Sequence, residues 1–426
     1  MKGQKTMSNK IYTVAILGVG ARGADIYGRI MAALPNKFKI VSLCDLREER
    51  LSVFGREFGV SEESCFTDEE SFFEKKRADA LIVATQDSDH VRHAIKAFEL
   101  GYDVLLEKPI TDSEEECKRL LEAQKKHNKK ALVCHVLRYA PAFVKAYELI
   151  ENGEIGRLIC IDALERVGYW HQAHSFVRGN WRSTECTAPM ILAKCCHDLD
   201  LLQYYAKAKC KSISSVGSLA YLKSENAPEG SVDRCTDCKY VDSCPYSAKR
   251  IYIDMWKSDG SPEDIWPYNI ITQAPLNENK LFDAIKKGPY GRCVYKCDNN
   301  VVDHEITEIA FENGVKANLT MTAFTYKGGR RLHFFGTLGE LILEEENETL
   351  TLKKFGSDVE VIDISIKNTG GYSHGGGDVN LIKEFYDMLS GKENTSTSLE
   401  SSIESHLMGI YAEKSRLADG EKYSIR

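Results

Sequence analysis

The sequence lacks long hydrophobic runs: nowhere do eighteen apolar residues follow one another, so no transmembrane helix is expected. Its opening segment, MKGQKTMSNKIYTV, has no apolar stretch ahead of a cleavage site, which argues against a secretory signal. An excess of positive charge is also missing, since the net charge is -7 and the isoelectric point is about 6.0. Neither nucleic acid nor an anionic membrane is therefore an expected partner, and we expect a soluble, cytoplasmic protein.

The pattern of a small secreted disulfide protein is absent as well. The chain has 14 cysteines among 426 residues, but most, such as Cys44, Cys134, Cys160 and Cys210, stand singly in apolar runs and are typical of small buried side chains. With 43% hydrophobic and 28% charged residues, the composition is that of an ordinary globular protein. The length is sufficient for two domains.

Short β-branched runs alternate with helical stretches over residues 1–137, which predicts a doubly wound parallel sheet. The predicted strands, each buried on both faces, are 13–18, 39–45, 78–85, 103–108 and 130–136. The predicted helices between them are 24–34, 47–58, 89–100 and 113–127.

Residues 138–426 follow a different pattern, in which later strands alternate apolar and polar side chains. A hairpin signal stands at Asn313 and Gly314, which indicates a mixed or antiparallel sheet. An irregular, cysteine-bearing insertion interrupts this part at about 224–300. Two helices are expected near 378–391 and 401–420, with Asp378 as the N-cap of the first.

The segment GVGARG at 18–23 joins the first predicted strand to the first predicted helix. Gly18 permits the tight turn, Gly20 lets the backbone approach a pyrophosphate, and Gly23 allows the helix to pack closely on the strand. The N–H groups at the helix start, around Ala21 and Arg22, can hold the anionic bridge. This context predicts a dinucleotide site.

Asp45 ends the second predicted strand, where a carboxylate can accept hydrogen bonds from both ribose hydroxyls and repels a 2′-phosphate. That favours NAD. Arg22 and Arg47 are close by and could pair with a phosphate, so NADP stays possible.

The next two predicted strands end in polar residues, TQDSDH at 85–90 and EKP at 107–109. Ligands bind at the carboxyl ends of strands in doubly wound sheets, so we expect Thr85, His90, Glu107 and Lys108 near the cofactor. Lys108 could hydrogen-bond the reacting oxygen and, in a desolvated site, exchange its proton. A lone lysine at a strand end would more often be a solvated charge.

Together these motifs resemble the Gfo/Idh/MocA family, which includes glucose–fructose oxidoreductase and inositol dehydrogenase. The segments RYAP at 138–141, NGEIG at 152–156 and HDLD at 197–200 also fit, and only the insertion falls outside the resemblance. The resemblance implies an N-terminal Rossmann domain and a C-terminal α/β domain with a large open, mostly antiparallel sheet. It also implies a homo-oligomer, a dimer or a tetramer, with Lys108 beside the nicotinamide and His197 in a catalytic or substrate-contacting role.

Position 193 departs from the family pattern. Many members have an Asp four residues before the histidine, whereas this chain has Ala193, followed by Lys194. The proton relay must therefore be built differently, or the reaction is not simple alcohol oxidation.

An aromatic and polar segment spans residues 169–182. Its His174, Arg178 and Trp181, together with Lys194, suit sugar rings with carboxylate or phosphate substituents, and we predict that they contact substrate. A surface loop anchored by its tryptophans is equally consistent. His374, four residues before Asp378, is more typical of a capped turn than of a catalytic role.

Cys235, Cys238 and Cys244 form a CxxC pair followed by a third cysteine, and either Cys293 or Cys297 could be a fourth ligand. Four thiolates suit a tetrahedral zinc ion, and we predict a structural zinc that stabilises the insertion. A [4Fe–4S] cluster also uses four thiolates, and free thiols are the remaining alternative.

The leading hypothesis is an NAD(P)-dependent oxidoreductase that acts on a CH–OH group of a sugar, sugar acid or cyclitol. Lys108 and His197 would orient the carbinol and exchange its proton. One alternative is an NAD-dependent glycoside hydrolase that oxidises its substrate transiently, as some relatives do. Another is a non-catalytic nucleotide or sugar sensor, against which the presence of Lys108 and His197 argues.

Overall fold

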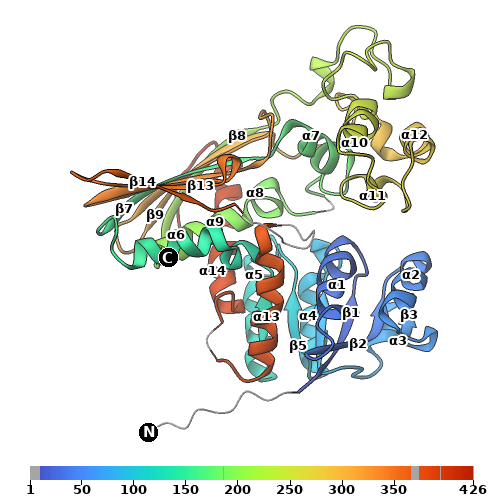
Figure 1. Cartoon of the computed structure of the whole chain (residues 1–426), viewed down its shortest axis with the longest axis horizontal. Coiled ribbons are helices and arrows are strands. Elements are labelled where there is room, and N and C mark those ends of the chain that lie inside the picture. The colour runs from blue at the N-terminus through green and yellow to red at the C-terminus, as the bar shows by residue number, and fades with distance from the viewer. Residues whose placement is uncertain (1–9, 186, 366–373, 394, 426) are drawn as a thin grey trace.

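The computed structural model describes residues 10–185, 187–365, 374–393 and 395–425. Figure 1 shows a first domain built on a parallel sheet, a second domain with one broad sheet, and an insertion that projects beside the broad sheet and above the first domain.

The described residues of the first domain form a six-stranded parallel sheet in the order β3-β2-β1-β4-β5-β6. The strand order reverses between β1 and β4, and ligands bind at such a switch point, outside the carboxyl ends of the strands. The predicted doubly wound sheet is confirmed, although the short β3 was not predicted because two residues carry no periodicity. The strands are β1 (Tyr12–Leu17), β2 (Phe38–Cys44), β3 (Cys65–Phe66), β4 (Ala80–Val83), β5 (Asp103–Leu106) and β6 (Ala131–Val133).

The helices of the first domain begin and end where local chemistry dictates. The Ser113 hydroxyl caps α5 by accepting from the Glu116 N–H at 3.3 Å, and Gly59, with φ of +67°, ends α2. The helical segments are η1 (Ala21–Gly28), α1 (Arg29–Ala32), α2 (Glu48–Phe58), η2 (Glu62–Ser64), α3 (Glu69–Phe73), η3 (Asp87–Asp89), α4 (His90–Glu99) and α5 (Glu114–Lys126).

The second sheet has nine strands among the described residues, in the order β14-β13-β12-β11-β7-β10-β9-β8-β15. Only β7 and β10 pair in parallel, so the predicted mixed, mostly antiparallel sheet is confirmed. The hairpin predicted at Asn313 and Gly314 joins β9 to β10. The strands are β7 (Leu158–Arg166), β8 (Cys210–Ser218), β9 (His304–Phe311), β10 (Lys316–Thr322), β11 (Gly329–Gly336), β12 (Gly339–Glu344), β13 (Thr349–Lys354), β14 (Val359–Asp363) and β15 (Tyr423–Ser424).

Helices cover one face of the second sheet, and its buried side chains alternate with exposed ones along β7, β9 and β10. The covering helices share one core with the sheet, into which Leu199, Leu202 and Met408 pack. They are α6 (Pro141–Glu151), α8 (Met190–Ala193), α9 (Cys196–Ala206) and α14 (Leu399–Leu417).

Helix α13 (Gly377–Leu389) returns to the first domain and completes its core. The ring of Phe385 stacks on that of Phe38 at 6.4 Å, so a segment far along the chain covers the first sheet. The expected N-cap is wrong: Gly376, with φ of +84°, holds that position, and Asp378 lies inside the first turn. The domain boundary between residues 137 and 138 remains a prediction.

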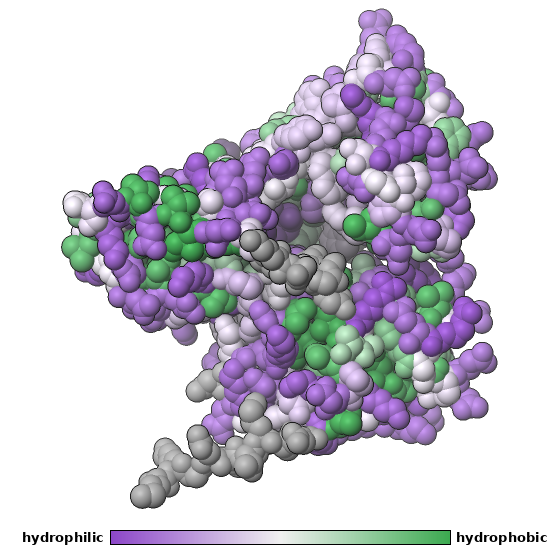
Figure 2. Space-filling model, in the orientation of Figure 1, coloured by the Kyte–Doolittle hydropathy of each residue, from purple (hydrophilic) through white to green (hydrophobic). Residues whose placement is uncertain are grey.

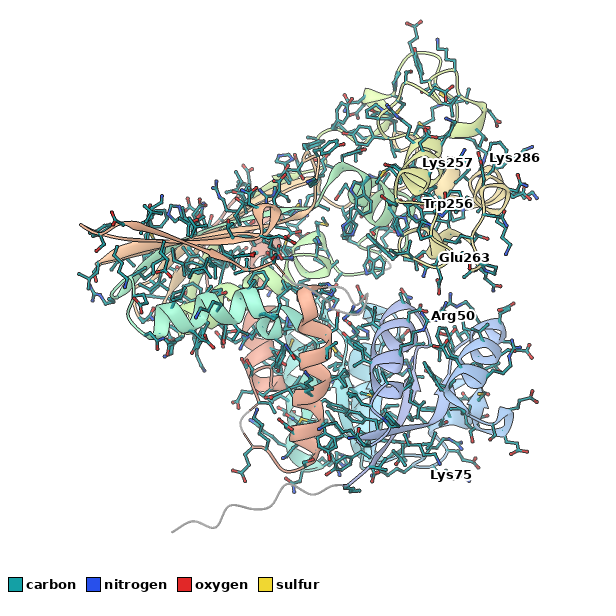
Figure 3. All side chains as sticks on the ribbon, in the orientation of Figure 1. Arg50, Lys75, Trp256, Lys257, Glu263 and Lys286 are labelled. Atoms are coloured by element: carbon teal, nitrogen blue, oxygen red, sulfur yellow. The ribbon has the colours of Figure 1, made fainter. Side chains whose placement is uncertain are left out.

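The insertion has a core of its own, lined by aromatic and aliphatic side chains that include Tyr252, Trp256 and Tyr268. It touches the first domain, because Arg29 of α1 lies 3.6 Å from the carboxylate of Asp264. In Figure 3 the labelled Glu263 and Arg50 lie on the facing edges of these two parts. Its helical segments are η6 (Ser224–Asn226), η7 (Cys235–Asp237), η8 (Arg250–Asp254), α10 (Met255–Ser258), α11 (Tyr268–Ile271), α12 (Glu278–Lys287) and η9 (Pro289–Gly291).

The remaining short segments are η4 (Val136–Tyr139), α7 (Tyr169–His171), η5 (Gln172–Arg178), η10 (Glu345–Asn347) and η11 (His374–Gly376). None of the helices in the described ranges is both long enough and apolar enough to cross a bilayer.

Candidate active site

The turn after β1 requires glycine at two of its three predicted positions. Gly18 has φ of +91°, and a Cβ there would lie 2.2 Å from the Ala84 carbonyl oxygen. A Cβ on Gly23 would lie 2.0 Å from the Gly18 carbonyl oxygen, so η1 can pack on β1 only without a side chain at that position. The space beside Gly20 is open: a Cβ on this residue would have a guanidinium nitrogen of Arg47 as its nearest neighbour, at 3.9 Å. A ligand can therefore approach the backbone at Gly20.

Asp45 lies next to this turn, as predicted from its place after β2. Its Oδ2 accepts from the Val19 N–H at 2.8 Å, and its Oδ1 accepts from the Arg47 N–H at 2.9 Å. The carboxylate thus holds the glycine turn and remains partly exposed, so its ribose-binding role stays a prediction. The Arg47 guanidinium donates to Asp45 at 3.2 Å and is more than half exposed.

The side chain of Arg22 binds three neighbouring polar side chains. Its guanidinium donates to Glu107 at 2.8 Å and to Asp378 at 2.6 Å, and a further N–H reaches the Tyr27 hydroxyl. Although burial alone would raise the pKa of Glu107, Arg22 and Lys108 hold it below its ordinary value. The cation of Arg22 is therefore neutralised, and Arg47 is the cation left exposed at the turn.

Lys108, at the carboxyl end of β5, reaches the second domain. Its Nζ donates to the Ala193 carbonyl at 3.1 Å, at the position where many family members carry an Asp. His197 begins α9 nearby and is 5% exposed. Burial lowers the pKa of His197 well below its ordinary value, and the charge of Lys108 lowers it further, so the imidazole is neutral. The structure thus brings together the two residues predicted to be catalytic.

Two family models match most of the chain. Residues 12–135 match the model described as oxidoreductase family, NAD-binding Rossmann fold, and residues 147–417 match the oxidoreductase family, C-terminal alpha/beta domain. The chain belongs to the Gfo/Idh/MocA family. The predicted resemblance is confirmed, and with it an NAD-binding oxidoreductase.

Individual relatives agree over different lengths. YteT of Bacillus subtilis (strain 168), a provisionally named oxidoreductase, is 24% identical over 408 residues, which cover 89% of this chain and 92% of that protein. The scyllo-inositol 2-dehydrogenase (NAD(+)) of the same organism is 29% identical over 205 residues, but these span only 48% of this chain and 57% of that enzyme. The fold matches that of a levoglucosan dehydrogenase solved with NADH and levoglucosan, with a TM-score of 0.70 at 18% identity and coverage of 98% and 100%.

Within this Gfo/Idh/MocA site, the loop after β4 is held in place by His90. Its Nδ1 lies 2.7 Å from the Pro109 carbonyl oxygen and its Nε2 lies 3.2 Å from that of Thr85, so the ring links the predicted 85–90 and 107–109 loops. His90 is 1% exposed, which suits a positioning role. The Thr85 hydroxyl lies 3.0 Å from the ring of His93.

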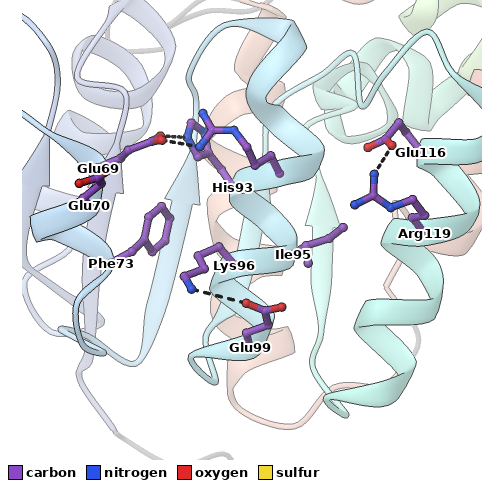
Figure 4. Close-up of a pocket in the computed structure, with 10 residues that line it drawn as sticks. Glu69, Glu70, Phe73, His93, Ile95, Lys96, Glu99, Glu116 and Arg119 are labelled. Carbon is purple, nitrogen blue, oxygen red and sulfur yellow. Dashed lines mark hydrogen bonds and ion pairs between the residues drawn. The ribbon is translucent and has the colours of Figure 1, made fainter.

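His93 also forms one wall of a surface groove on the first domain, where its Nε2 lies 2.5 Å from Glu69 (Figure 4). None of the residues lining this groove carries a predicted role, and charged pairs such as Arg119 with Glu116 occupy its rim. The groove lies apart from Lys108 and His197, and we assign it no part in the chemistry.

Two histidines that the sequence analysis did not select lie beside His197. His135, just beyond β6, is fully buried, and neither of its ring nitrogens has a hydrogen-bond partner among the described residues. Its ring lies 6.0 Å from that of His197. His135 could have been predicted as a site residue, because it follows the carboxyl end of a parallel strand, where ligands bind.

His374 is the second of these histidines. Its ring lies 5.9 Å from that of His197, and its Nδ1 lies 3.1 Å from Asp378, the carboxylate that also binds Arg22. The expectation of a simple capped turn at His374 is therefore too narrow. No local pattern could show this pairing, because it depends on the return of α13 to the first domain.

His135, Cys196 and His197 have ligand atoms that all lie within 4.8 Å of one another. Two neutral imidazoles and a thiol could hold a soft metal ion. Burial, however, raises the pKa of Cys196 to about 12, and the charge of Lys108 beside it would repel a cation. These surroundings therefore disfavour a resident metal ion beside Cys196.

Lys194 does not provide a free positive charge. Its Nζ lies 3.0 Å from Glu165, whose other oxygen lies 3.0 Å from Arg330, and Arg330 in turn pairs with Asp198 at 2.8 Å. Burial and the neighbouring Glu165 raise the pKa of Asp198 to about 6, against the effect of Arg330. These ion pairs join β7 and β11 of the second sheet to α9, the helix that carries His197.

The other predicted substrate residues lie where the second domain meets the insertion. His174 is 3% exposed, lies 2.8 Å from the Tyr252 hydroxyl and stacks on Tyr290. Arg178 is 1% exposed and donates to backbone carbonyls of the insertion, while Trp181 is 36% exposed. The structure does not bring these three residues to Lys108 and His197.

His171 also belongs to the 169–182 segment but was not among the predicted site residues. It lies close to Lys108, because burial lowers the pKa of His171 well below its ordinary value and the charges of Lys194 and Lys108 lower it further. Trp266 of the insertion lies edge-on to it at 5.0 Å. Figure 2 shows the surface hollowed where the insertion, the broad sheet and the first domain meet.

Proposed function

We propose that the protein is an NAD-dependent dehydrogenase that oxidises a CH–OH group of a sugar, sugar acid or cyclitol. The observation that carries the proposal is the cation of Lys108 beside the neutral imidazole of His197, at the carboxyl end of β5. A donor and a neutral base are what a carbinol needs when its proton leaves together with its hydride. The names of two relatives, an inositol dehydrogenase and a levoglucosan dehydrogenase, support this substrate class.

Bound NAD supplies the hydride acceptor, and the residues of this chain manage the proton. Lys108, whose Nζ is oriented by the Ala193 carbonyl, donates to the carbinol oxygen and stabilises its developing negative charge. The Nδ1 of His197 has no partner among the described residues and accepts the carbinol proton. His135 contacts a neighbouring hydroxyl of the substrate.

His374 and Asp378 take the place of the aspartate missing at position 193. The ring centroids of His197 and His374 are 5.9 Å apart, and we propose that one hydroxyl or water bridges their nitrogens. That bridging group passes the proton from His197 to His374, and Asp378, 3.1 Å from the Nδ1 of His374, stabilises the imidazolium that then forms.

Lys108→Ala tests this assignment. We expect kcat to fall about 10²-fold or more, while the Kd for NAD, measured by calorimetry, changes little. Lys96→Ala on the exposed surface of α4 is the matched control, because its Nζ pairs only loosely with Glu99 at 3.7 Å. An unchanged kcat in Lys108→Ala would refute the proposal and would favour a nucleotide sensor.

One observation favours a second candidate, the NAD-dependent hydrolysis of glycosides. Lys108 meets a backbone carbonyl instead of the carboxylate that would complete the usual Asp–Lys–His arrangement. Sugars, uronates, inositols and aryl glycosides should be screened while NADH absorbance is followed. Stoichiometric NADH supports the dehydrogenase, whereas aryl release with a catalytic amount of cofactor supports the hydrolase.

We propose NAD over NADP because the Asp45 carboxylate stands where a 2′-phosphate would lie. Arg47, which is exposed beside it, keeps NADP binding possible. Comparing the Kd values for the two cofactors decides between them, and Arg47→Ala should weaken NADP more than NAD.

We also propose that the uncovered face of the second sheet joins a second copy of the chain in a homo-oligomer. Apolar side chains on the paired strands β8 and β9 are exposed there, among them Val216 at 51% and Ile306 at 47%. Sedimentation of the wild type and of Val216→Lys distinguishes an assembly from a monomer.

A cytoplasmic location completes the proposal. It is supported by the thirteen described cysteines, none of which forms a disulfide. We assign the zinc predicted for the insertion a structural role alone, with no part in hydride transfer.

A further inference from the structure

A buried guanidinium without a carboxylate stands where η5 meets the insertion. Arg178 is 1% exposed, and its Nε and Nη2 donate to the carbonyls of Arg292 and Tyr246 at 2.7 and 2.8 Å. In the ranges that the structure describes, it forms no ion pair with an Asp or Glu, and its Nη1 has no partner. An isolated buried charge is so costly that an anion is expected beside it.

With no carboxylate beside Arg178, the nearby groups that could carry a negative charge are cysteine thiols. The Nη2 of Arg178 lies 3.5 Å from the Sγ of Cys235, and that residue lines one small cavity together with three other cysteines: Cys238, Cys244 and Cys293. A neutral thiol cannot balance a guanidinium, whereas a thiolate can.

Backbone pairing brings these cysteines together from distant positions. An isolated bridge pairs Arg234 with Arg292, and the Cys293 N–H donates to the Asp233 carbonyl at 2.8 Å. Cys293 is thereby fixed opposite the CxxC turn. Cys297 does not line the cavity, and its Sγ–H points to the Cys293 carbonyl at 3.2 Å.

We propose that Cys235, Cys238, Cys244 and Cys293 hold a metal centre as four thiolates and that Arg178 is its buried countercharge. Four thiolates around a divalent ion carry a net charge of -2, which supplies the anion that Arg178 otherwise lacks. The fourth ligand is Cys293, a choice that spacing alone left open. The proposal assigns Arg178 to this centre, whereas a substrate contact by His174 stays a prediction.

The shared chemistry is tetrathiolate coordination, by a zinc ion or by an iron–sulfur cluster. A tetrahedral zinc holds its sulfurs about 3.8 Å apart, as its bond length of about 2.3 Å requires. The only group of three or more in the described ranges whose ligand atoms lie mutually within 4.8 Å is that of His135, Cys196 and His197, so no three of the cysteine sulfurs lie that close together. Zinc therefore requires the thiols to move inward on binding.

The centre also supports the proposed substrate site. Arg178 ends η5, the helical segment that continues from α7 with His171, the residue close to Lys108. Loss of the metal should therefore loosen the part of the pocket wall that His171 forms, without touching the glycine turn.

The test is metal analysis of the full-length protein purified anaerobically without chelators. We expect about one zinc per chain in a colourless protein, or about four irons with visible charge-transfer absorption, and either result supports four-thiolate coordination. Less than about 0.2 equivalents of any transition metal would overturn it.

Matched variants then test the ligands. Cys293→Ser should lose most of the metal, whereas Cys297→Ser, four residues away, should keep it; the reverse pattern would overturn the ligand assignment. Arg178→Met should speed metal loss to a competing chelator at least tenfold, whereas Arg182→Met should not. Circular dichroism shows whether each variant is folded, and if Cys293→Ser unfolds, the chelator rates of the folded Arg178→Met and Arg182→Met proteins still decide. Retained NAD affinity in metal-depleted protein separates this result from a failure of the proposed dehydrogenase.

Discussion

Glu305 is a buried carboxylate on β9 that folding holds in an unfavourable environment. It is 1% exposed, and only one of its oxygens has a partner among the described residues, the Ser215 hydroxyl at 2.7 Å. Burial raises the pKa of Glu305 from 4.5 to about 7, against the effect of that hydrogen bond. The folded protein therefore binds a proton here that the unfolded chain has already released between these two pH values.

The sign of the pH dependence follows from this. Because the folded pKa lies above the unfolded one, the free energy of unfolding falls as pH rises from 4.5 to 7. At 1.36 kcal/mol per unit of pKa the loss is about 3 kcal/mol. Glu305→Gln keeps the shape of the side chain but cannot ionise, so it should escape this loss. Its melting temperature should exceed that of the wild type by about 3 °C at pH 8, given the unfolding entropy of a chain of this size.

The assay is thermal unfolding of both proteins at pH 5 and pH 8. At pH 5 the wild-type carboxyl is mostly protonated when folded, and the two melting temperatures should nearly agree. Glu308→Gln, on the exposed side of the same strand, should change neither. An equal gain for Glu305→Gln at both pH values, or no gain at pH 8, would refute the reasoning.

Three further predictions concern the turn, the core and the relay. Gly18→Ala should abolish NAD binding in calorimetry and destabilise the first domain, because its Cβ would meet the Ala84 carbonyl at 2.2 Å; binding within threefold of wild type would contradict this. Arg138→Met should cost about 3–5 kcal/mol in thermal unfolding because it leaves the buried Asp200, now bound at 2.6 Å, without its cation. Arg119→Met at an exposed pair should cost less than about 1 kcal/mol, and equal costs would refute the argument. His374→Ala should lower kcat at least tenfold with unchanged NAD affinity, and an unchanged kcat would exclude the proposed relay.

Much of the fold follows from local pattern. Strands buried on both faces give continuous apolar runs, so the parallel sheet could be predicted, whereas β3, with two residues, could not. Gly18, Gly23 and Asp45 were predictable because the chemistry of a dinucleotide turn restricts residue type at fixed spacing. His174 and Arg178 were predicted to contact substrate from their residue types alone. Their burial against the insertion could not be predicted, because it depends on residues far along the chain.

The sequence by itself determined the dinucleotide turn and the two kinds of sheet, because each depends on short-range spacing or periodicity, whereas the pairing of Lys108 with His197 was expected only from the family resemblance. Only the tertiary structure decided which charges neutralise one another. Arg22 meets Asp378 across 356 positions, and Arg178 meets Cys235 across 57, because folding removes these charges from water and each must then find a partner wherever the chain brings one. Residue type alone therefore does not show that Arg47 remains exposed at the glycine turn while Arg22 and Arg178 bind partners brought to them by folding.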